Sequence, residues 1–526
     1  MKLNIKQIKN SCLVLAASCM AATACTGDFE SFNTDPNSAQ TMDLTMLITT
    51  MEMDAVFPCG GSDTDPVNRY QTGFNMFGDN YAGYMAAYHD WSGGRNPLVY
   101  VMDNASYRDT NFEVAFTRVM PSWLTLKYAH DSGQISDDIF AVANILKVMS
   151  LHRVTDMYGP APVTHFGESR NPYESEETCY KHYFEVLNDA IAVLTDFVAG
   201  SPDARPLSKV DAVYGGDYSK WLKLANSVKL RLAMRIVYVE PQLAQQYATE
   251  AVESGVMESA DDSAMLKSYL NITVNNPLKT IWDGYNDARM SATMDSYMNG
   301  YQDPRLAAYF QTAAAGGYHG VANGIYMPKQ DDYKGMSAPN VAESTPVRWM
   351  MASEVAFLRA EGAARNWQMG GSAESFYNRG IELSFTENNL SAAAAATYAG
   401  NSSLRPIDFT DTSAAATKYN ISALGTITIK WEDGGFEEQL ERIITQKWIA
   451  MYPNGQEAWS EFRRTGYPRI FPVRNNQSTD INTETQIRRV IFPQSEYSNN
   501  LTAVNRAIGL LGGPDSGATK LWWDKK

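Results

Sequence analysis

The sequence predicts a mostly α-helical fold. Apolar residues recur every three or four positions through several long segments, which is the spacing of one buried helix face. Proline and glycine follow these segments where they end, as Pro241 and Gly466 do. By contrast, one short run, 426–429, alternates polar and apolar residues as a β-strand does. Helices should therefore form the framework, with little strand content.

The predicted helices group into pairs. The first pair combines a helix over 135–154 with one over 178–198. The remaining helices are expected at 217–239, 242–253, 350–367, 373–385, 437–451 and 456–464. Neighbouring helices then form four pairs, at about 135–198, 217–254, 350–385 and 437–464. Pairs of this size are typical of tetratricopeptide-like units, which span ~34 residues each. The alternative is irregular helical packing without true repeats.

Two long segments lack this periodicity. The first is a loop-rich insertion at about 258–348, and the second covers 387–432. Loops of this length inside a compact protein are usually functional or disordered. The insertion contains many aromatic residues, and disordered segments are poor in them. We therefore expect an ordered, functional insertion within a single domain that covers 41–526.

The N-terminus has the layout of an export signal. Three lysines precede an apolar run over 12–24, which is too short for a confident membrane span. The run ends in small residues directly before Cys25, an arrangement that resembles a lipoprotein processing site. We expect a signal peptide at 1–24, lipidation of Cys25 and a linker at 25–40. Cys19 also follows small residues, and an ordinary signal peptide is a further alternative.

Net charge and cysteine content exclude several classes of partner and site. The formal net charge of −15 argues against nucleic acid or an anionic membrane surface as partners. Beyond the signal region only Cys59 and Cys179 remain, which excludes a disulfide-stapled scaffold or a cysteine metal site. Their spacing does not decide whether they pair, and the unpaired state is slightly favoured.

The first candidate binding segment runs from Asp79 to Trp91. A sugar ring needs an aromatic platform flanked by polar side chains, and aromatic-rich loops also suit a peptide. Asp79, Tyr81, Tyr84 and Trp91 are the candidates here, with Trp91 beside a Gly-Gly turn at a rim. Tyr81, Tyr84 and Tyr88 are spaced to share one helix face. The alternative is that these tyrosines pack their helix against a neighbour.

The second candidate binding segment runs from Trp282 to Arg289. Its candidates are Trp282, Tyr285, Asn286 and Arg289, which combine a platform, hydroxyl partners and a cation. The alternative is a loop held by its own Asp and Asn turns.

Catalytic and metal signatures are weak. The six histidines form no HExxH motif, and neither a Walker loop nor a GxSxG elbow is present. The abundant carboxylates leave an all-helical glycosidase as a minor alternative. Asp63, Asp65, Asp331 and Asp332 offer oxygen ligands for a structural calcium ion, but solvated acidic loops are the favoured interpretation. We expect no cofactor, no metal site and no catalysis.

Several stretches together carry a family resemblance. They lie, in order, at 25–30, 33–37, 69–73, 156–160, 303–306, 353–361, 371–381, 442–449, 454–459, 461–469 and 492–497. In this order they resemble the SusD/RagB family of outer-membrane nutrient-binding lipoproteins of Bacteroidetes. Most of these residues look structural: Trp448 and Trp459 fall on apolar helix faces, and the arginines brace loops.

The resemblance implies a SusD-like fold, mostly α, with four tetratricopeptide-like helix pairs and binding loops in the irregular segments. It also implies a cell-surface lipoprotein of the outer membrane. Such a protein captures an oligosaccharide, in preference to a peptide, and delivers it to a SusC-like TonB-dependent transporter for which it acts as the lid. A purely structural tetratricopeptide adaptor is the alternative. Ligand contacts cannot be transferred from the family residue by residue.

Overall fold

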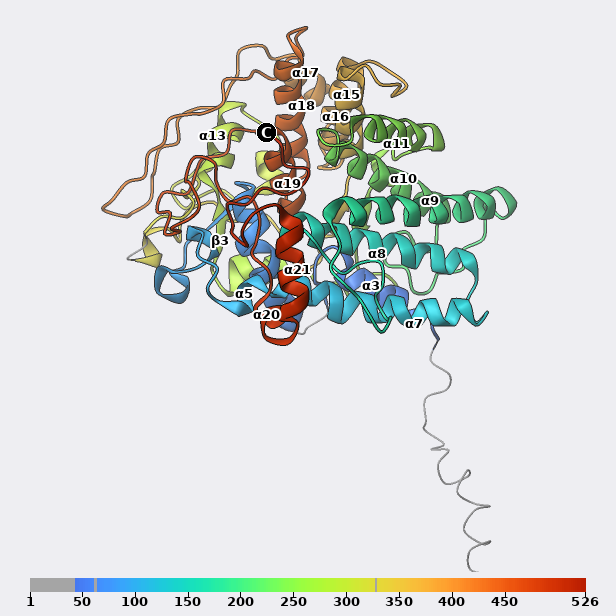
Figure 1. The fold of residues 1–526 in the computed structure, drawn as a ribbon. Helices are drawn as coiled ribbons and strands as arrows, with labels where there is room; N and C mark the ends of the chain where they lie inside the picture. Colours follow the sequence, from blue (N-terminus) through green and yellow to red (C-terminus); the bar gives the residue numbers. More distant parts are fainter. Residues whose placement is uncertain (1–42, 61–63, 327–328) are drawn as a thin grey trace, which may run out of the picture. The chain divides into compact units, whose positions relative to one another are not determined.

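The computed structural model describes residues 43–60, 64–326 and 329–526 (Figure 1). Helices make up most of its regular structure, as the sequence predicts. The expected signal peptide and the linker with Cys25 lie outside the described residues. Among the residues that are described, no helix combines the length and the apolar character that a membrane span requires.

A helix pair occupies each of the four expected segments. The pairs are α8 (Asp137–Tyr158) with α9 (Glu176–Gly200), α10 (Tyr218–Arg235) with α11 (Pro241–Ser254), α15 (Ala352–Ala364) with α16 (Ala373–Thr386), and α18 (Phe436–Ala450) with α19 (Gly455–Thr465). In Figure 1, helices α8 to α11 lie side by side on the right of the fold. The apolar periodicity of the sequence therefore corresponds to real packing faces.

Shorter helices complete the α content. They are α3 (Met46–Ala55), α4 (Asp65–Tyr70), α5 (Ala105–Arg108), α6 (Thr110–Glu113), α7 (Met120–Asp131), α12 (Pro277–Lys279), α13 (Ala292–Gly300), α14 (Leu306–Tyr309), α17 (Ala392–Ala399), α20 (Gln494–Asn499) and α21 (Leu501–Leu511). Three π-helical segments lie at Gln71–Asp79, Val114–Val119 and Thr280–Gly284. Both loop-rich segments of the sequence thus contain short helices.

Side-chain caps fix where the long helices begin. Ser175 accepts a hydrogen bond from the amide of Thr178, and Ser372 accepts one from the amide of Ser375. Each oxygen satisfies an amide that has no partner within its own helix. At the C-terminal end of α19, Gly466 adopts a φ of 79°, which suits a residue without a side chain.

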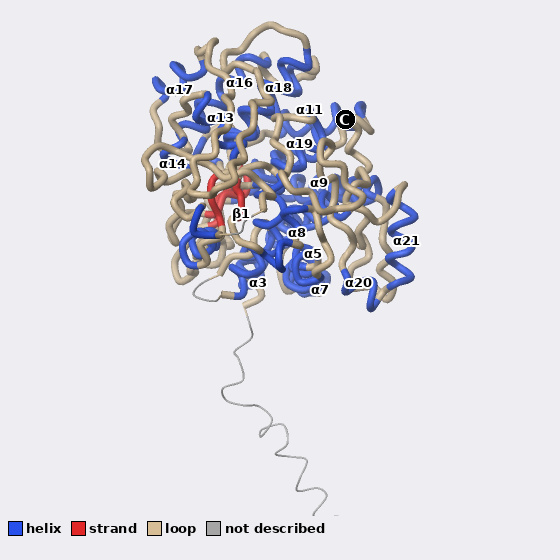
Figure 2. The backbone as a smooth tube through the Cα atoms, turned by 90° about the vertical axis from the view of Figure 1, so that its left-hand side faces the viewer, coloured by secondary structure: helices blue, strands red, loops and turns tan. Residues whose placement is uncertain are grey.

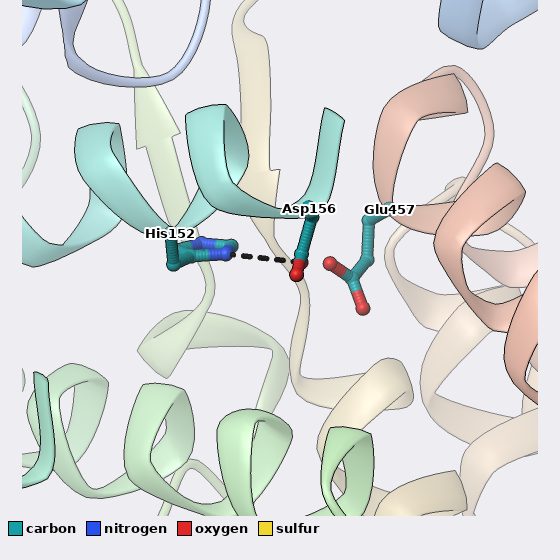
Figure 3. A group of neighbouring side chains, drawn as sticks. All are labelled: His152, Asp156 and Glu457. Carbon is teal, nitrogen blue, oxygen red and sulfur yellow. Dashed lines mark ion pairs between the residues drawn. The ribbon is translucent and has the colours of Figure 1, made fainter. Parts of the chain in front are cut away.

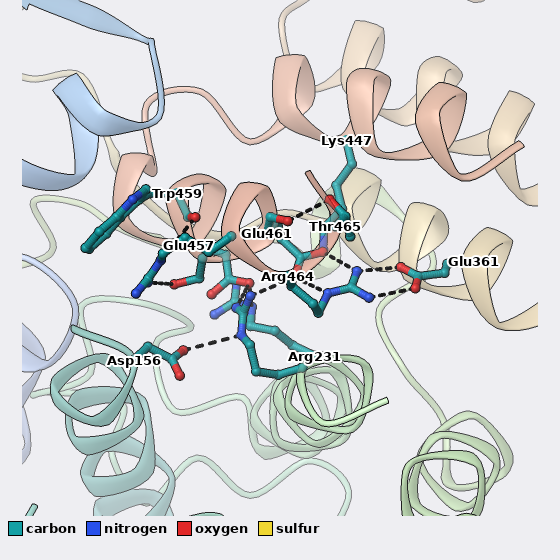
Figure 4. Close-up of polar contacts among 12 residues, drawn as sticks. Asp156, Arg231, Glu361, Lys447, Glu457, Trp459, Glu461, Arg464 and Thr465 are labelled. Atoms are coloured by element: carbon teal, nitrogen blue, oxygen red, sulfur yellow. Dashed lines mark hydrogen bonds and ion pairs between the residues drawn. The ribbon is translucent and has the colours of Figure 1, made fainter. Parts of the chain in front are cut away.

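A buried ion-pair network joins the helix pairs (Figure 4). Arg464 of α19 donates to both oxygens of Glu361 on α15, at 2.7 and 2.6 Å. Arg235 of α10 donates to Glu461 at 2.7 Å, and Lys447 of α18 reaches the same carboxylate at 2.8 Å. All five side chains are almost completely buried. Charges this deep need partners on every side, so the network fixes four helices relative to one another.

The strands of the described residues form two small antiparallel sheets, and strands are drawn in red in Figure 2. Strand β1 (Met85–Ala87) pairs with β3 (Ala288–Met290), and β2 (Ala264–Leu266) pairs with β4 (Val347–Met350). The predicted strand at 426–429 is wrong, because these residues have no ladder partner. Their apolar side chains are buried instead, with Ile427 and Ile429 at 7% and 0% exposure.

The two cysteines of the body are buried and free. The Sγ of Cys59 donates to the carbonyl of Phe57 at 3.3 Å, and that of Cys179 to the carbonyl of Ala161 at 3.6 Å. Burial raises the pKa of both thiols. The favoured prediction of unpaired cysteines agrees with these positions, and both side chains act as small core residues.

Candidate ligand-binding site

The β1–β3 sheet brings the two candidate binding segments together. The register places Met85 opposite Met290 and Ala87 opposite Ala288. The chain therefore leaves β1 towards Trp91 beside the stretch through which it enters β3 from Tyr285. The sequence places these segments far apart and contains no signal for their pairing.

Asp79, Tyr81 and Tyr84 lie in the core below this sheet. The Tyr81 hydroxyl donates to the carbonyl of Pro97 at 2.8 Å, and the Tyr84 hydroxyl donates to the carbonyl of Trp448. Both tyrosines are at most 5% exposed. The interpretation in which the tyrosines pack against neighbouring elements fits these contacts.

The predicted shared helix face of the three tyrosines is wrong. The helical segment ends at Tyr81, Gly83 adopts a φ of 66°, and β1 begins two residues later. Trp448 fixes this turn, because its indole nitrogen donates to the carbonyl of Ala82 at 2.8 Å. A turn of this kind sends Tyr84 and Tyr88 in directions that a helix would not.

Asp79 is a buried carboxylate held by three donors. Its oxygens accept from the Tyr70 hydroxyl and the Asn75 amide, both at 2.9 Å, and from the amide of Gly455 at 3.3 Å. Burial raises the pKa of Asp79 to about 6, although these donors favour the ionised form. Its contacts tie the first binding segment to the start of α19.

Trp91 lies at the surface, on a short turn that begins with it. Ser92, Gly93 and Gly94 all adopt positive φ angles in this turn, which explains the two glycines. The Trp91 ring is half-buried and contacts the rings of His89, at 5.0 Å between centroids, and Tyr107, at 6.2 Å. These neighbours hold the indole in one orientation.

A shallow cleft of about 30 Å³ adjoins this turn. Its lining includes His89, Asp90, Asn96, Tyr326, Asn475 and Gln477. Tyr326 is 65% exposed, so its ring faces solvent at this cleft. Among the described residues, the side chains of Asp90, Asn475 and Gln477 have no hydrogen-bond partner. Free polar groups thus lie beside the exposed Tyr326 ring.

Backbone hydrogen bonds assemble this cleft from distant loops. The amide of Gln477 donates to the carbonyl of Val99 at 3.0 Å, and the amide of Asn475 donates to that of Gly324 at 2.8 Å. Sequence reasoning missed Tyr326, Asn475 and Gln477. Tyr326 belongs to the aromatic-rich insertion, which is the one signal that pointed to it, and nothing marked the other two.

The second candidate segment is held largely by the protein itself. The Trp282 indole donates to the carbonyl of Val341 at 3.0 Å, and the Tyr285 hydroxyl donates to Asn68 at 3.0 Å. Arg289 is 4% exposed and donates to the carbonyl of Lys334. Asn286 adopts a φ of 55° in the turn before β3. Trp282, Tyr285 and Asn286 are half-buried, so part of each side chain faces solvent.

Unsatisfied polar atoms lie where the two segments meet. The Arg289 guanidinium stacks 4.5 Å from the Tyr88 ring. Among the described residues, the Tyr88 hydroxyl and one oxygen of Asp287 have no hydrogen-bond partner. Burial raises the pKa of Asp287 to about 6, against the hydrogen bond from Gln71 and the nearby His89. Such groups are costly without partners, so this junction is suited to polar contacts.

Comparison with known families identifies the fold. The model of the SusD-like family, described as Susd and RagB outer membrane lipoprotein, matches residues 28–524. The chain belongs to the SusD-like family. The predicted fold class is therefore confirmed, and the family consists of outer-membrane lipoproteins that bind nutrients.

Solved structures of SusD homologues resemble this SusD-like protein over nearly its whole length. A chitin-binding SusD homologue from Flavobacterium johnsoniae is 36% identical, with a TM-score of 0.85 over 92% of this chain and 99% of that chain. A SusD-like protein from Bacteroides thetaiotaomicron is 36% identical, with a TM-score of 0.84 over the same shares. No curated protein matches the sequence.

One buried cluster of this SusD-like protein has the composition of a metal site (Figure 3). Ligand atoms of His152, Asp156 and Glu457 lie within 4.8 Å of one another. Arg235, however, lies 3.5 Å from Asp156 and hydrogen-bonds to Glu457. Arg235 thus pairs with both carboxylates, and Arg231 lies 3.9 Å from Glu457, so the cluster is part of the ion-pair network rather than a cation site.

Proposed function

We propose that this SusD-like protein captures an oligosaccharide at the cleft beside Trp91 and delivers it to a SusC-like TonB-dependent transporter. The observation that supports this is the exposed Tyr326 ring in a cleft with the free polar groups of Asp90, Asn475 and Gln477, next to the turn that begins with the half-buried Trp91. A sugar ring stacks through its apolar face on such rings and hydrogen-bonds through its hydroxyl groups. The chitin-binding relative supports N-acetylglucosamine oligomers as the first candidates.

The cleft is too shallow to enclose a ligand, which favours a chain that lies across it. Trp282, Tyr285 and Asn286 precede β3 of the same sheet and extend the proposed surface, and the buried Arg289 of β3 supports it by stacking on Tyr88. Asp79, Tyr81 and Tyr84 contribute from below, because they position the turn from which β1 and Trp91 follow. In this proposal they act through that turn and not through contact with the sugar.

Calorimetric titration with a panel of neutral oligosaccharides tests the proposal. Chito-, malto-, xylo- and manno-oligosaccharides are titrated into the purified mature chain, together with a peptide library. Trp91→Ala and Tyr326→Ala should each weaken binding of one oligosaccharide class by about tenfold, since a well-placed aromatic contact contributes on the order of 1.4 kcal/mol.

Tyr128→Ala is the matched control, because Tyr128 is 56% exposed on α7 and belongs to neither candidate segment. If only peptides bind, the cargo is a peptide and not an oligosaccharide. Absence of any ligand would favour the structural adaptor. Cleaved glycan after incubation would contradict the proposal that the protein has no catalytic step. Delivery requires that a transporter barrel co-purifies with the protein.

A further inference from the structure

A second and larger pocket lies at the tips of three helix pairs. It measures about 420 Å³ and is bordered by the α10–α11 turn, the loop between α15 and α16, and the start of α18. Trp367 and Phe436 provide its aromatic surfaces. We call it the helix-tip pocket. It shares no element with the cleft beside Trp91, and Figure 1 draws β3 and α11 on opposite sides of the fold.

Arg365 makes the aromatic wall of this pocket rigid. Its guanidinium donates to Glu361 at 3.1 and 2.8 Å and to the Tyr238 hydroxyl at 3.1 Å. The same group stacks 4.7 Å from the Phe436 ring and 5.0 Å from the Tyr238 ring. The wall is therefore ordered before any ligand arrives, which reduces the entropic cost of binding.

The end of α15 positions Trp367 at the mouth of the helix-tip pocket. Asn366 adopts a φ of 63°, and the amide of Trp367 donates back to the carbonyl of Gly362 at 2.9 Å. The Trp367 side chain is left half-buried. Among the described residues, its indole nitrogen has no hydrogen-bond partner, and it lines the pocket.

The polar groups of the helix-tip pocket are amides. Gln242, Gln245 and Asn366 line it, and in the described part of the chain their side chains have no hydrogen-bond partner. Among the lining residues, Arg365 alone carries a charge, and its guanidinium is already paired with Glu361, which Arg464 shares. A cationic ligand would find no counter-charge among the lining residues, and an anionic one would find only a guanidinium already bonded to Glu361 and Tyr238. The chemistry suits a neutral molecule with an apolar face and several hydroxyl groups.

We propose that the helix-tip pocket is a second binding site for a neutral oligosaccharide. The inference depends on the proposed function for the class of ligand, but its residues are independent of the cleft beside Trp91. Two separate contacts on one chain raise the effective affinity for a long glycan that can span them, without a new kind of interaction at either site. A polymer would then bind more tightly than a short oligomer.

The test uses the mature chain with the cleft disabled. A Trp91→Ala, Tyr326→Ala variant is titrated with the same panel of neutral oligosaccharides. It should retain weaker binding to one site per chain, and adding Trp367→Ala should lower that remaining affinity at least tenfold. Trp367→Phe, which keeps an aromatic face, should restore part of it. Tyr128→Ala in the same background should change nothing.

The outcomes separate this inference from the proposed function. If the wild-type chain binds an oligosaccharide but the cleft-disabled variant binds none, the helix-tip pocket is not a glycan site. If Trp91→Ala and Tyr326→Ala leave binding intact while Trp367→Ala abolishes it, the cleft is not a binding site and the helix-tip pocket is. If the wild-type chain binds no oligosaccharide, both fail. Equal thermal unfolding temperatures of all variants show that each measurement concerns folded protein.

Discussion

Tyr81 and Trp91 belong to the same segment but contact different surroundings. Tyr81 is 5% exposed and its hydroxyl donates to the carbonyl of Pro97, whereas Trp91 is half-buried beside a cleft. Tyr81→Phe should therefore lower the free energy of unfolding by about 1–3 kcal/mol, because it leaves a buried carbonyl without its donor. Urea denaturation measures this change, and oligosaccharide affinity should stay the same. A loss of affinity at unchanged stability would place Tyr81 in contact with the ligand.

At this scale the sequence predicted Trp91 better than Tyr81. The Gly-Gly turn after Trp91 indicated a rim position, and the structure leaves Trp91 half-buried on that turn. The turn at Gly83 ended the helical segment early, so the helical spacing assumed for the tyrosines did not apply. Tyr326 and Gln477 reach the cleft through hydrogen bonds between distant backbone segments. Local spacing carries no information about such contacts.

At the scale of elements, Gly83 decides how the first binding segment enters β1. Its φ is 66°, and an added Cβ would lie 3.0 Å from Ile470 and 3.1 Å from Thr293. Gly83→Ala should cost about 1–3 kcal/mol of stability through backbone strain and crowding. It should also weaken oligosaccharide binding, because Trp91 follows the same turn. Urea denaturation and the calorimetric titration measure the two effects.

Gly133→Ala is the control for this substitution. Gly133 also has a positive φ, 73°, but an added Cβ would meet no atom within 4 Å. It should show the backbone strain alone and leave ligand affinity unchanged. Equal losses of stability in the two variants would mean that crowding at Gly83 is negligible, and unchanged affinity in Gly83→Ala would separate this turn from the cleft.

The helix pairs were predictable because each is specified locally. Periodic apolar residues and caps such as Ser175 and Ser372 act within a few positions of one another. Sheet β1–β3 depends on two segments that are far apart in the chain, and neither has a clear alternating pattern. Residues 426–429 show the reverse error. They alternate as a strand does, but buried isoleucines and no strand partner define their place.

For the whole molecule, the buried ion pairs predict how stability depends on pH. Burial opposes ionisation of Glu361, but the charges of Arg464 and Arg365 lower its pKa to about 2. Arg235 and Arg231 likewise lower the pKa of Glu457 to about 2. Because the folded-state pKa values lie below the ordinary value of 4.5, the ionised carboxylates stabilise the fold above that pH. This contribution is lost as the pH falls from 4.5 towards 2.

The midpoint of urea denaturation should therefore fall steeply between these pH values. Glu361→Gln should lower the free energy of unfolding by about 3–5 kcal/mol at neutral pH, since it leaves Arg464 with an uncompensated buried charge. It should also reduce the fall of the urea midpoint between pH 4.5 and 2. A urea midpoint of the wild-type chain that stays constant between pH 4.5 and 2 would contradict the stabilising role given to the ionised Glu361 and Glu457.

Asp79 changes stability in the opposite sense, over a range that reaches higher pH. Burial raises its pKa to about 6, so its contribution declines as the pH rises through that value.

We expect lipidation of Cys25, which lies outside the described residues, to anchor the protein to the membrane. Two or three acyl chains anchor a protein stably, whereas a single chain binds only marginally. Cys25→Ala should therefore move the protein from the membrane fraction to the soluble fraction, while its oligosaccharide affinity stays the same. Mass spectrometry of the wild-type mature N-terminus should find a lipidated Cys25. A lipidated Cys19 would move the processing site, and retention of Cys25→Ala in the membrane would require a different anchor.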